Sequence, residues 1–319
     1  MPLAVLHSAE AWAEHLGKSR KRTAVTIGNF DGVHLGHQKI LRGVLERAQQ
    51  SDLMSAVLTF YPHPARVLRP AQAPALLETL AQRLEAIEAM GIEAALVIQF
   101  DVELARLSPE DFVRRFLVDA MRAEHVLVGA NFRFGHHQAG DAKLLADLGG
   151  QWNFNTEVIP SLVEDGEVVS STAIRNALRD GDVEQAARML GRPFSLAGEI
   201  KTGTGQGRKL VVPTLNLSTE QELLPKDGVY ATEAVVEGKI YRAATNVGVR
   251  PTFDGARRTV ESHLFDFSGD LTSGKLEVRF RKRLRDEQKF SGPADLRAQI
   301  LRDIEQSKEY FREAASKTV

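Results

Sequence analysis

Two histidines lie three residues apart in a glycine-rich segment, residues 28–37, which reads Gly28-Asn29-Phe30-Asp31-Gly32-Val33-His34-Leu35-Gly36-His37. The segment follows a short apolar run and opens a helical pattern. Backbone N–H groups at a helix N-terminus bind anions, and glycine lets the backbone approach them closely. Two imidazoles on one helix face can donate hydrogen bonds to phosphate oxygens while charge moves onto a leaving pyrophosphate. The pattern therefore predicts chemistry on a phosphate group.

Two other interpretations of His34 and His37 stay open. A zinc pair on a helix usually has a spacing of four residues and needs a third ligand, and the chain has no cysteine to supply a thiolate. The two side chains would otherwise be a helix cap and a core residue without a catalytic role. The place of the segment favours the phosphate site, because ligands of open α/β sheets bind beyond the carboxyl ends of strands.

A second candidate phosphate contact lies at residues 169–175. Ser171 and Thr172 can cap a helix, and Arg175 would lie on the next turn of that helix. A guanidinium in this position can hold a triphosphate through several hydrogen bonds. The alternative is an ordinary capped helix with an arginine on its surface.

The second half of the chain holds polar residues that suit a nucleotide. A glycine-rich loop contains Gly203, Gly207 and Arg208, and a short strand pattern follows it. Thr214 and Asn216 would share one face of that strand, and their hydroxyl and amide oxygens can ligate Mg²⁺. The alternative is a turn followed by the solvated face of an edge strand.

A carboxylate, Glu261, would share a strand face with His263 and Phe265, because side chains alternate along a strand. General-base catalysis on a substrate hydroxyl requires such a group within hydrogen-bond reach. Glu261 is therefore a candidate base, and the alternative is a charge at the rim of the sheet.

The first part of the chain alternates strand patterns with helix patterns. Short apolar runs bounded by turn residues indicate buried parallel strands at 23–28, 55–60, 94–100 and 125–129. Helical patterns lie at 36–50, 76–90, 108–122, 171–179 and 182–190. Ser108 caps the third of them, with proline at the first helical position. The alternation predicts an α/β fold with a doubly wound, Rossmann-like parallel sheet.

After residue 193, strand patterns follow one another without helices between them. They lie at 194–200, 214–218, 228–236, 239–247, 259–267 and 275–284. Gly238 marks a hairpin turn between two of these strands. The pattern predicts a small antiparallel β-barrel. An amphipathic pattern over 293–315 predicts a terminal helix packed on the barrel through Leu296, Ile300 and Ile304.

Charge changes along the chain at the same place as the pattern. Residues 1–185 carry a net charge of −6 and eight of the nine histidines, whereas residues 186–319 carry +5. A chain of 319 residues suits two domains. We therefore predict one domain over 1–185 and a second over 186–319.

Composition excludes several classes of protein. The absence of cysteine excludes a disulfide scaffold, an iron–sulfur cluster and a cysteine nucleophile. A net charge of −1 argues against nucleic acid as the main partner. No apolar run approaches the roughly 18 residues of a membrane span, and no signal-peptide layout is visible. We therefore expect no membrane association and a cytoplasmic location.

In order along the chain, these motifs resemble those of the bifunctional riboflavin kinase/FAD synthetase family of prokaryotes. Residues 28–37 resemble its adenylyltransferase motif with a His-x-Gly-His core. Other first-half matches are the Phe-x-Pro-His-Pro segment at 60–64, the Gly-x-[Asp/Asn]-Phe-x-Phe-Gly turn at 129–135 and the Ser-Ser-Thr-x-x-Arg motif at 170–175. Matches to the riboflavin kinase module lie at 207–216, 246–253 and 260–267. The resemblance spans about residues 20–305.

The resemblance implies two reactions that each use ATP and Mg²⁺: riboflavin is phosphorylated to FMN, and FMN is adenylylated to FAD. It implies that His34 and His37 stabilise the transferred α-phosphate and that Asn29, Asn131 and Arg175 position ATP. It also implies that Glu261 takes the proton from the ribityl 5′-hydroxyl, while Thr214 and Asn216 hold Mg-ATP. The other residues implied to bind nucleotide are Gly28, Phe30, Asp31, Gly32, Ser171, Thr172, Gly203, Gly207, Arg208 and Arg250.

Two positions depart from the family pattern, with Val211 in place of a usual glycine and Thr272 in place of a usual tyrosine. Valine resists positive φ, so we expect weaker ATP binding in the kinase step. Two rival functions are a nucleotidyltransferase with another acceptor, such as phosphopantetheine or nicotinate mononucleotide, and a flavin-binding protein without catalysis. The kinase-like half argues against the first, and the presence of His34 with Glu261 argues against the second.

Overall fold

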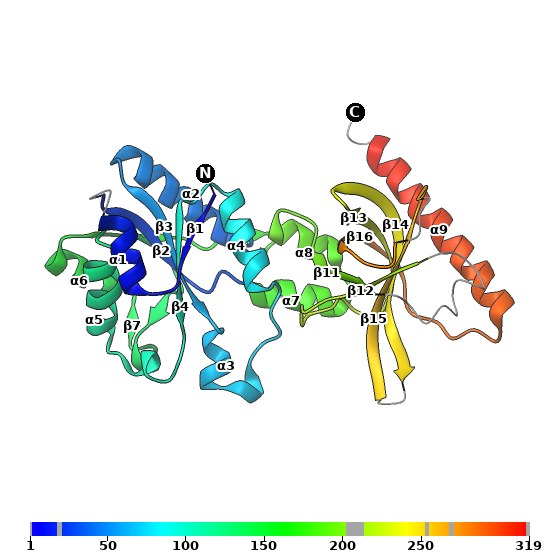
Figure 1. Cartoon of the computed structure of the whole chain (residues 1–319), viewed down its shortest axis with the longest axis horizontal. Helices are drawn as coiled ribbons and strands as arrows, with labels where there is room; N and C mark the ends of the chain where they lie inside the picture. The colour runs from blue at the N-terminus through cyan, green and yellow to red at the C-terminus, as the bar shows by residue number, and fades with distance from the viewer. Residues whose placement is uncertain (1, 18–20, 202–213, 253–254, 268–270, 317–319) are drawn as a thin grey trace. The chain divides into compact units, whose positions relative to one another are not determined.

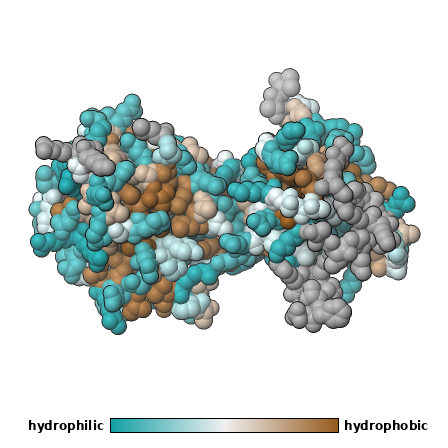
Figure 2. Space-filling view, viewed as in Figure 1, coloured by the Kyte–Doolittle hydropathy of each residue, from teal (hydrophilic) through white to brown (hydrophobic). Residues whose placement is uncertain are grey.

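The computed structural model describes residues 2–17, 21–201, 214–252, 255–267 and 271–316, and the side chains of residues 250–257 lie outside that description. Contacts between residues divide the chain into two compact units, Met1–Ser170 and Ser171–Val319 (Figure 1). On the face shown in Figure 2, hydrophilic residues surround patches of hydrophobic residues. No helix among the described residues is long and apolar enough to cross a membrane.

A parallel sheet of six strands forms the centre of the first unit, in the order β1-β4-β3-β2-β5-β8. The strands are β1 (Ala4–Leu6), β2 (Thr23–Ile27), β3 (Met54–Tyr61), β4 (Ala94–Gln99), β5 (Ala123–Gly129) and β8 (Asn155–Ile159). The predicted doubly wound sheet is confirmed. Because β2 has β3 on one side and β5 on the other, the winding reverses beside β2, where such sheets bind their ligands.

Helices cover both faces of this sheet (Figure 1). On one face, Leu41 and Val44 of α2 and Ile87 of α4 pack on β2 and β3. On the other face, a separate core surrounds Trp12 and Phe116. The helical segments are α1 (Ala9–Gly17), α2 (Leu35–Gln50), α3 (Pro64–Leu68), η1 (Pro70–Gln72), α4 (Leu80–Ala89), η2 (Leu104–Arg106), α5 (Pro109–Phe112), the π-helical η3 (Val113–Ala120), η4 (His136–Gln138) and α6 (Ala142–Trp152). Short strand pairs join β6 (Arg133–Phe134) to β7 (Gly140–Asp141) and β9 (Val163–Glu164) to β10 (Glu167–Val168).

Capping residues determine where two helices begin. Ser108 Oγ accepts a hydrogen bond from the Asp111 N–H at 3.0 Å, so α5 begins where predicted. α4 begins at Leu80 rather than at residue 76, because Thr79 forms a capping box with Gln82. The Gln82 N–H donates to Thr79 Oγ1 at 3.3 Å, and the Thr79 N–H donates to Gln82 Oε1 at 2.9 Å.

The second unit contains a closed antiparallel barrel in the order β11-β12-β15-β14-β13-β16. Its strands are β11 (Ser195–Lys201), β12 (Leu215–Ser218), β13 (Gly228–Val236), β14 (Lys239–Thr252), β15 (Gly255–Leu264) and β16 (Lys275–Arg285). Its helices are α7 (Ser171–Asp180), α8 (Val183–Leu190) and α9 (Pro293–Ser316). Ile304 and Ile300 of α9 pack on Ala244 and Phe265 of the barrel, as the amphipathic pattern predicts. Leu296, the third residue of that prediction, is half-buried and lies outside this cluster. The predicted barrel and terminal helix are confirmed.

Three hydroxyl groups form a chain inside the barrel. Alternate residues along the strands are buried, and among them Thr232, Thr245 and Ser262 are fully buried on three different strands. Thr245 Oγ1 lies 2.6 Å from Thr232 Oγ1 and 2.8 Å from Ser262 Oγ. Because Thr245 is the central member, its hydroxyl is a hydrogen-bond partner of both neighbours in the buried interior.

Thr245→Val should destabilise the barrel by about 1–3 kcal/mol, because it leaves two buried hydroxyls with fewer partners while it keeps the side-chain shape. Urea denaturation, monitored by far-UV circular dichroism, measures the change in the free energy of unfolding. The matched control is Thr272→Val, at an exposed position, which should change stability by less than about 0.5 kcal/mol. Equal effects of the two substitutions would show that the chain of hydroxyl groups contributes nothing to the stability of the barrel.

The division between the compact units falls before α7, whereas the predicted domain boundary at 185/186 lies inside α8. α7 contacts α8, and α8 contacts β16 of the barrel. A cut at residue 186 therefore removes α7 and part of a helix that packs on the barrel. The boundary at 185/186 stays a prediction, with the start of α7 as the position that the contacts favour.

Candidate active sites

The loop after β2 makes a tight bend that returns the chain to the start of α2. Phe30, Gly32 and Val33 adopt positive φ angles of 50°, 89° and 36°. The Val33 N–H donates to the Phe30 carbonyl at 3.1 Å, and both side chains are buried at 1% exposure. The apolar side chains anchor the bend in the core between the sheet and α2. This places the loop at the carboxyl edge of the sheet, as the sequence predicts.

His34 is the N-cap of α2. Its Nδ1 accepts a hydrogen bond from the His37 N–H at 3.3 Å, so Nδ1 carries no proton and the proton of the neutral ring lies on Nε2. The His34 and His37 rings stack with centroids 3.6 Å apart and planes 15° apart. A Cβ atom on Gly36 would approach the His34 ring to 3.2 Å, so glycine leaves room for the stack. The capping interpretation of His34 is correct, and it makes Nε2–H the donor of this ring.

His37 is held neutral by its surroundings. Burial lowers the pKa of His37 well below its usual range, and the neighbouring His34 and Arg83 lower it further. Its Nδ1 is buried and has no hydrogen-bond partner among the described residues. The Phe30 ring meets the His37 ring edge-on, with centroids 5.1 Å apart. Because both imidazoles are neutral, they can stack at the helix N-terminus without charge repulsion and act together as hydrogen-bond donors.

The Asp31 carboxylate is buried and accepts hydrogen bonds from the backbone of the protein. It is 2% exposed, and its oxygens accept hydrogen bonds from the Leu77 N–H at 3.0 Å and the Glu78 N–H at 3.4 Å. Those residues directly precede the cap of α4. Asp31 therefore anchors the loop to the start of α4, and its predicted contact with nucleotide stays a prediction.

The other first-unit candidates lie at the ends of neighbouring strands. Gly28 and Asn29 follow β2, and both are half-buried. Asn131 is exposed in the turn after β5, where the Phe132 N–H donates to the Gly129 carbonyl at 3.0 Å. Because β2 and β5 are parallel neighbours, Asn29 and Asn131 lie at the same edge of the sheet.

The Ser-Ser-Thr-x-x-Arg segment belongs to the second compact unit. Ser171 and Thr172 are the first two residues of α7 rather than residues that precede it, which corrects the predicted cap. Arg175 is 6% exposed on the same helix, so it is not the surface arginine of the alternative interpretation. Its predicted place beside the two histidines stays a prediction, because the two units are described separately.

Glu261 lies at the centre of a row of polar residues on the barrel. β12 pairs Asn216 with Glu261, and β14 pairs Asn246 with Glu261. Directly opposite residues on neighbouring strands share a face, with Cβ atoms about 4.5–5.5 Å apart. Thr259 Oγ1 donates to Glu261 Oε1 at 3.2 Å. Thr214 is exposed directly before β12, so the structure brings Thr214, Asn216 and Glu261 to one part of the barrel.

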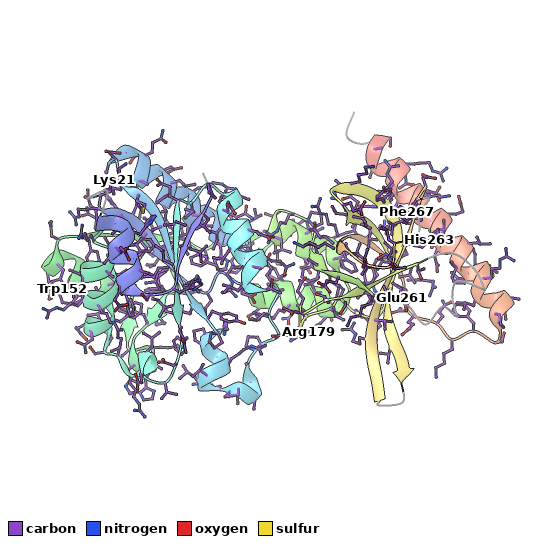
Figure 3. All side chains as sticks on the ribbon, in the orientation of Figure 1. Lys21, Trp152, Arg179, Glu261, His263 and Phe267 are labelled. Atoms are coloured by element: carbon purple, nitrogen blue, oxygen red, sulfur yellow. The ribbon has the colours of Figure 1, made fainter. Side chains whose placement is uncertain are left out.

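The face of β15 that carries Glu261 points away from the barrel interior. Val260, Ser262 and Leu264 are buried inside, whereas Glu261 and His263 are half-buried and follow one another along the strand in Figure 3. Phe265 lies just past the end of β15, with its ring 5.8 Å from that of His263. It packs with Ile300 and Ile304 of α9. The ring contact supports the predicted common face for His263 and Phe265.

Four predicted nucleotide-binding residues have no described side chain. Gly203, Gly207 and Arg208 lie outside the described residues, as does Val211. Arg250 lies on β14, and only its backbone is described. Asn246 is a residue of the Glu261 row that the sequence analysis did not single out, although it opens the motif at 246–253. Only the register between β14 and β15 reveals that Asn246 lies opposite Glu261, and the sequence pattern does not show that register.

The residues on the barrel suit magnesium in chemical type. No group of three or more His, Asp or Glu side chains in the described ranges is placed to hold a metal ion by itself. Magnesium usually keeps several waters and binds through one or two protein oxygens together with substrate phosphates. The hydroxyl of Thr214 and the amide of Asn216 supply such oxygens beside the Glu261 carboxylate, so the donor set fits Mg²⁺ that arrives with ATP.

Comparison with known proteins covers both units. A family model described as FAD synthetase matches residues 17–173, and one described as Riboflavin kinase matches residues 190–311. The bifunctional riboflavin kinase/FMN adenylyltransferase of Pseudomonas fluorescens is 38% identical over 291 residues, which cover 91% of this chain and 93% of the relative. The Escherichia coli (strain K12) protein of the same name is 36% identical over 288 residues, which cover 90% of this chain and 92% of the relative.

A solved structure also resembles the chain. A protein named macrolide-efflux protein, from Streptococcus pneumoniae, matches with a TM-score of 0.83 and 27% identity, over 97% of this chain and 99% of that one. The name belongs to that protein, and the likeness supports the fold described above. Because both family models and relatives along most of its length agree, the chain belongs to the bifunctional riboflavin kinase/FMN adenylyltransferase family, and it converts riboflavin to FMN and FMN to FAD.

Proposed function

We propose that the His34–His37 pair supports adenylyl transfer in the first unit and that Glu261 acts as the base of the kinase step in the second. The observation that carries the first role is the neutral, stacked histidine pair at the N-terminus of α2, beside the strand where the sheet reverses its winding. The second role is supported by the Asn216–Glu261–Asn246 row on the barrel.

In adenylyl transfer, a phosphate oxygen of FMN attacks the α-phosphorus of ATP, and the bond to the β-phosphate oxygen breaks. Negative charge then grows on the leaving pyrophosphate. His34 Nε2–H can donate to an oxygen of that group, because Nδ1 is occupied by the cap. Asn29, Asn131 and Arg175 would position ATP. Donors of this kind act without reorganisation when they are held in place before the reaction.

In the kinase step, the ribityl 5′-hydroxyl oxygen attacks the γ-phosphorus of ATP, and ADP leaves. Glu261 would accept the hydroxyl proton, which makes the oxygen a better nucleophile. Thr259 Oγ1 donates to Oε1 of the carboxylate, which helps to fix the orientation of the Glu261 side chain. Thr214 and Asn216 would hold Mg²⁺, which neutralises the phosphate charge when bound with ATP.

Exposed apolar side chains at the carboxyl edge of the sheet support a flavin as the acceptor. Tyr61 at the end of β3, Leu68 on α3 and Val102 after β4 are 50%, 55% and 51% exposed. A flat aromatic ring system gains from contact with such surface. Phosphopantetheine has no comparable ring system.

We also propose a cytoplasmic location and small-molecule substrates only.

The test is a single time course of the full chain with riboflavin, ATP and MgCl₂, with products separated by chromatography. FMN should appear first and FAD after it, and both should stop when EDTA removes magnesium. Phosphopantetheine and nicotinate mononucleotide, supplied in place of flavin, should give no adenylylated product. Flavin binding without turnover would identify the non-catalytic rival.

A second test concerns the start of the kinase unit. Residues 171–319 contain α7, α8 and the whole barrel, so this fragment should fold and make FMN from riboflavin. Residues 186–319 lack α7 and the start of α8, and they should give less folded protein and a lower melting temperature. Thermal unfolding and FMN formation measure both fragments. Equal behaviour of the two would favour the boundary at 185/186.

A further inference from the structure

Arg83 is a buried cation that the functions described so far do not use. It lies on α4 and is 1% exposed. Within the described part of the chain it forms no ion pair, and its Nε has no hydrogen-bond partner. Its one hydrogen bond is a long one, from Nη1 to the Phe60 carbonyl at 3.5 Å. Burial of a charge is costly unless a partner offsets it, so this arrangement calls for an explanation.

The surroundings of Arg83 are those of the adenylyl site. Phe60 lies near the carboxyl end of β3, the neighbour of β2. Ile87, one turn along α4 from Arg83, packs with Phe30 and Val33 of the loop before α2. Asp31 of that loop bonds to the backbone just before α4. Arg83 is therefore held behind the loop that carries the two histidines.

At His37, the positive charge of Arg83 is not fully offset by the negative charges that lie around Arg83. Burial lowers the pKa of Arg83, while the charges of Asp31, Glu78 and Tyr61 raise it. The Asp31 carboxylate is directed to the Leu77 and Glu78 N–H groups. The positive charge of Arg83 is felt at His37, where it opposes protonation. A guanidinium keeps its charge in such a site.

We propose that Arg83 is a positioning residue for adenylyl transfer. Its buried positive charge attracts the negative charge of the polyphosphate bound in front of His34 and His37. In a dry site, a fixed charge acts over several ångströms without contact. It attracts the nucleotide phosphates and stabilises the charge that grows on the departing pyrophosphate. This inference rests on the proposed role of the histidine pair.

The proposal predicts an unusual combination of effects for Arg83→Met. Replacement of a buried charge by an apolar side chain of similar length should leave the melting temperature of the full chain unchanged or higher when no ligand is present. The same substitution should lower kcat/KM of FMN adenylylation by about 10–100-fold, because the positive field is lost. Riboflavin phosphorylation should stay unchanged.

The experiment compares Arg83→Met, Arg83→Lys and the control Arg47→Met in the full chain. Arg47 lies on α2 and pairs with Glu157 at the surface, so its loss changes net charge equally without changing the buried field. Inorganic pyrophosphate serves as the probe in thermal unfolding. It should raise the melting temperature of the wild type, Arg83→Lys and Arg47→Met, and raise that of Arg83→Met much less.

Arg83→Lys keeps the charge, so it should retain most of the adenylylation rate. A lower melting temperature of Arg83→Met with its response to pyrophosphate intact would overturn the proposal and make Arg83 a structural residue, and so would failure of Arg83→Met to fold. Absence of FAD synthesis in the wild type would instead count against the proposed function. The pyrophosphate measurement would then still decide whether Arg83 supports an anion site.

Discussion

Glu261→Gln lowers riboflavin phosphorylation by about 10²–10⁴-fold and leaves the adenylylation of added FMN unchanged, if Glu261 is the base. Glutamine keeps the side-chain shape and can still accept the hydrogen bond from Thr259. It cannot take a proton from the substrate hydroxyl. The loss should appear in kcat, because the proton moves only in the transition state. Steady-state kinetics of the two half-reactions, each started from its own flavin, measures this.

The matched control is Glu237→Gln. Glu237 lies in the exposed turn between β13 and β14 of the same barrel, so the change removes one carboxylate without touching the Glu261 row. Its kinase rate should match the wild type. If Glu261→Gln keeps most of its kinase rate, Glu261 is a structural carboxylate that only orders Thr259 and its neighbours.

His34→Ala should lower FAD formation from FMN by about 10²–10³-fold, while FMN formation continues. Alanine removes two things at once: the Nε2–H donor and the cap of α2. Loss of a cap costs about 1 kcal/mol of stability. A fall in activity therefore needs a second variant that separates the two effects.

His34→Asn provides that separation. Asparagine is a favourable N-cap, so α2 should keep its stability, but its amide does not reach as far as Nε2. We expect a melting temperature near that of the wild type together with the same loss of FAD formation. His15→Ala, at an exposed position on α1, is the control for removal of an imidazole. Recovery of the rate in His34→Asn would mean that the cap, and not the donor, matters.

The fold could be predicted wherever burial left a strong pattern in the sequence. β2, β3, β4 and β5 are buried on both faces, so they appear as continuous apolar runs. β1 has only three residues, and β8 contains only exposed and half-buried positions. Strands of this kind at the edges of a sheet leave little trace in hydrophobicity. Both therefore went unpredicted.

The start of α4 shows how a distant residue overrides a local pattern. Leu76 and Leu77 extend the apolar spacing of the helix toward its N-terminus. The Leu77 N–H, however, is held by Asp31, which comes from a loop more than forty residues earlier. Such a contact has no signature in the local sequence, so the helix was predicted to begin too early.

The residues of the two sites could be predicted by type more readily than by partner. The spacing of His34 and His37 indicates a shared helix face, but it does not show that one ring caps the helix and stacks on the other. Alternation places Glu261 on one face of its strand. It does not reveal that Asn246 lies opposite, since that depends on the register between two strands. Arg83 had no signal at all, because a lone arginine in a helix is usually exposed.

Strand order also governs how the chain can fold while it is being synthesised. β1 emerges first from the ribosome, but its only partner in the sheet, β4, lies about ninety residues later. β11 likewise pairs with β16, so the barrel closes only when its last strand has been translated. Until then, β11 and β13, the two strands that pair with β16, present open edges to other chains. We therefore expect slowed translation near the end of the barrel to favour aggregation, a vulnerability that the closed, finished barrel no longer has.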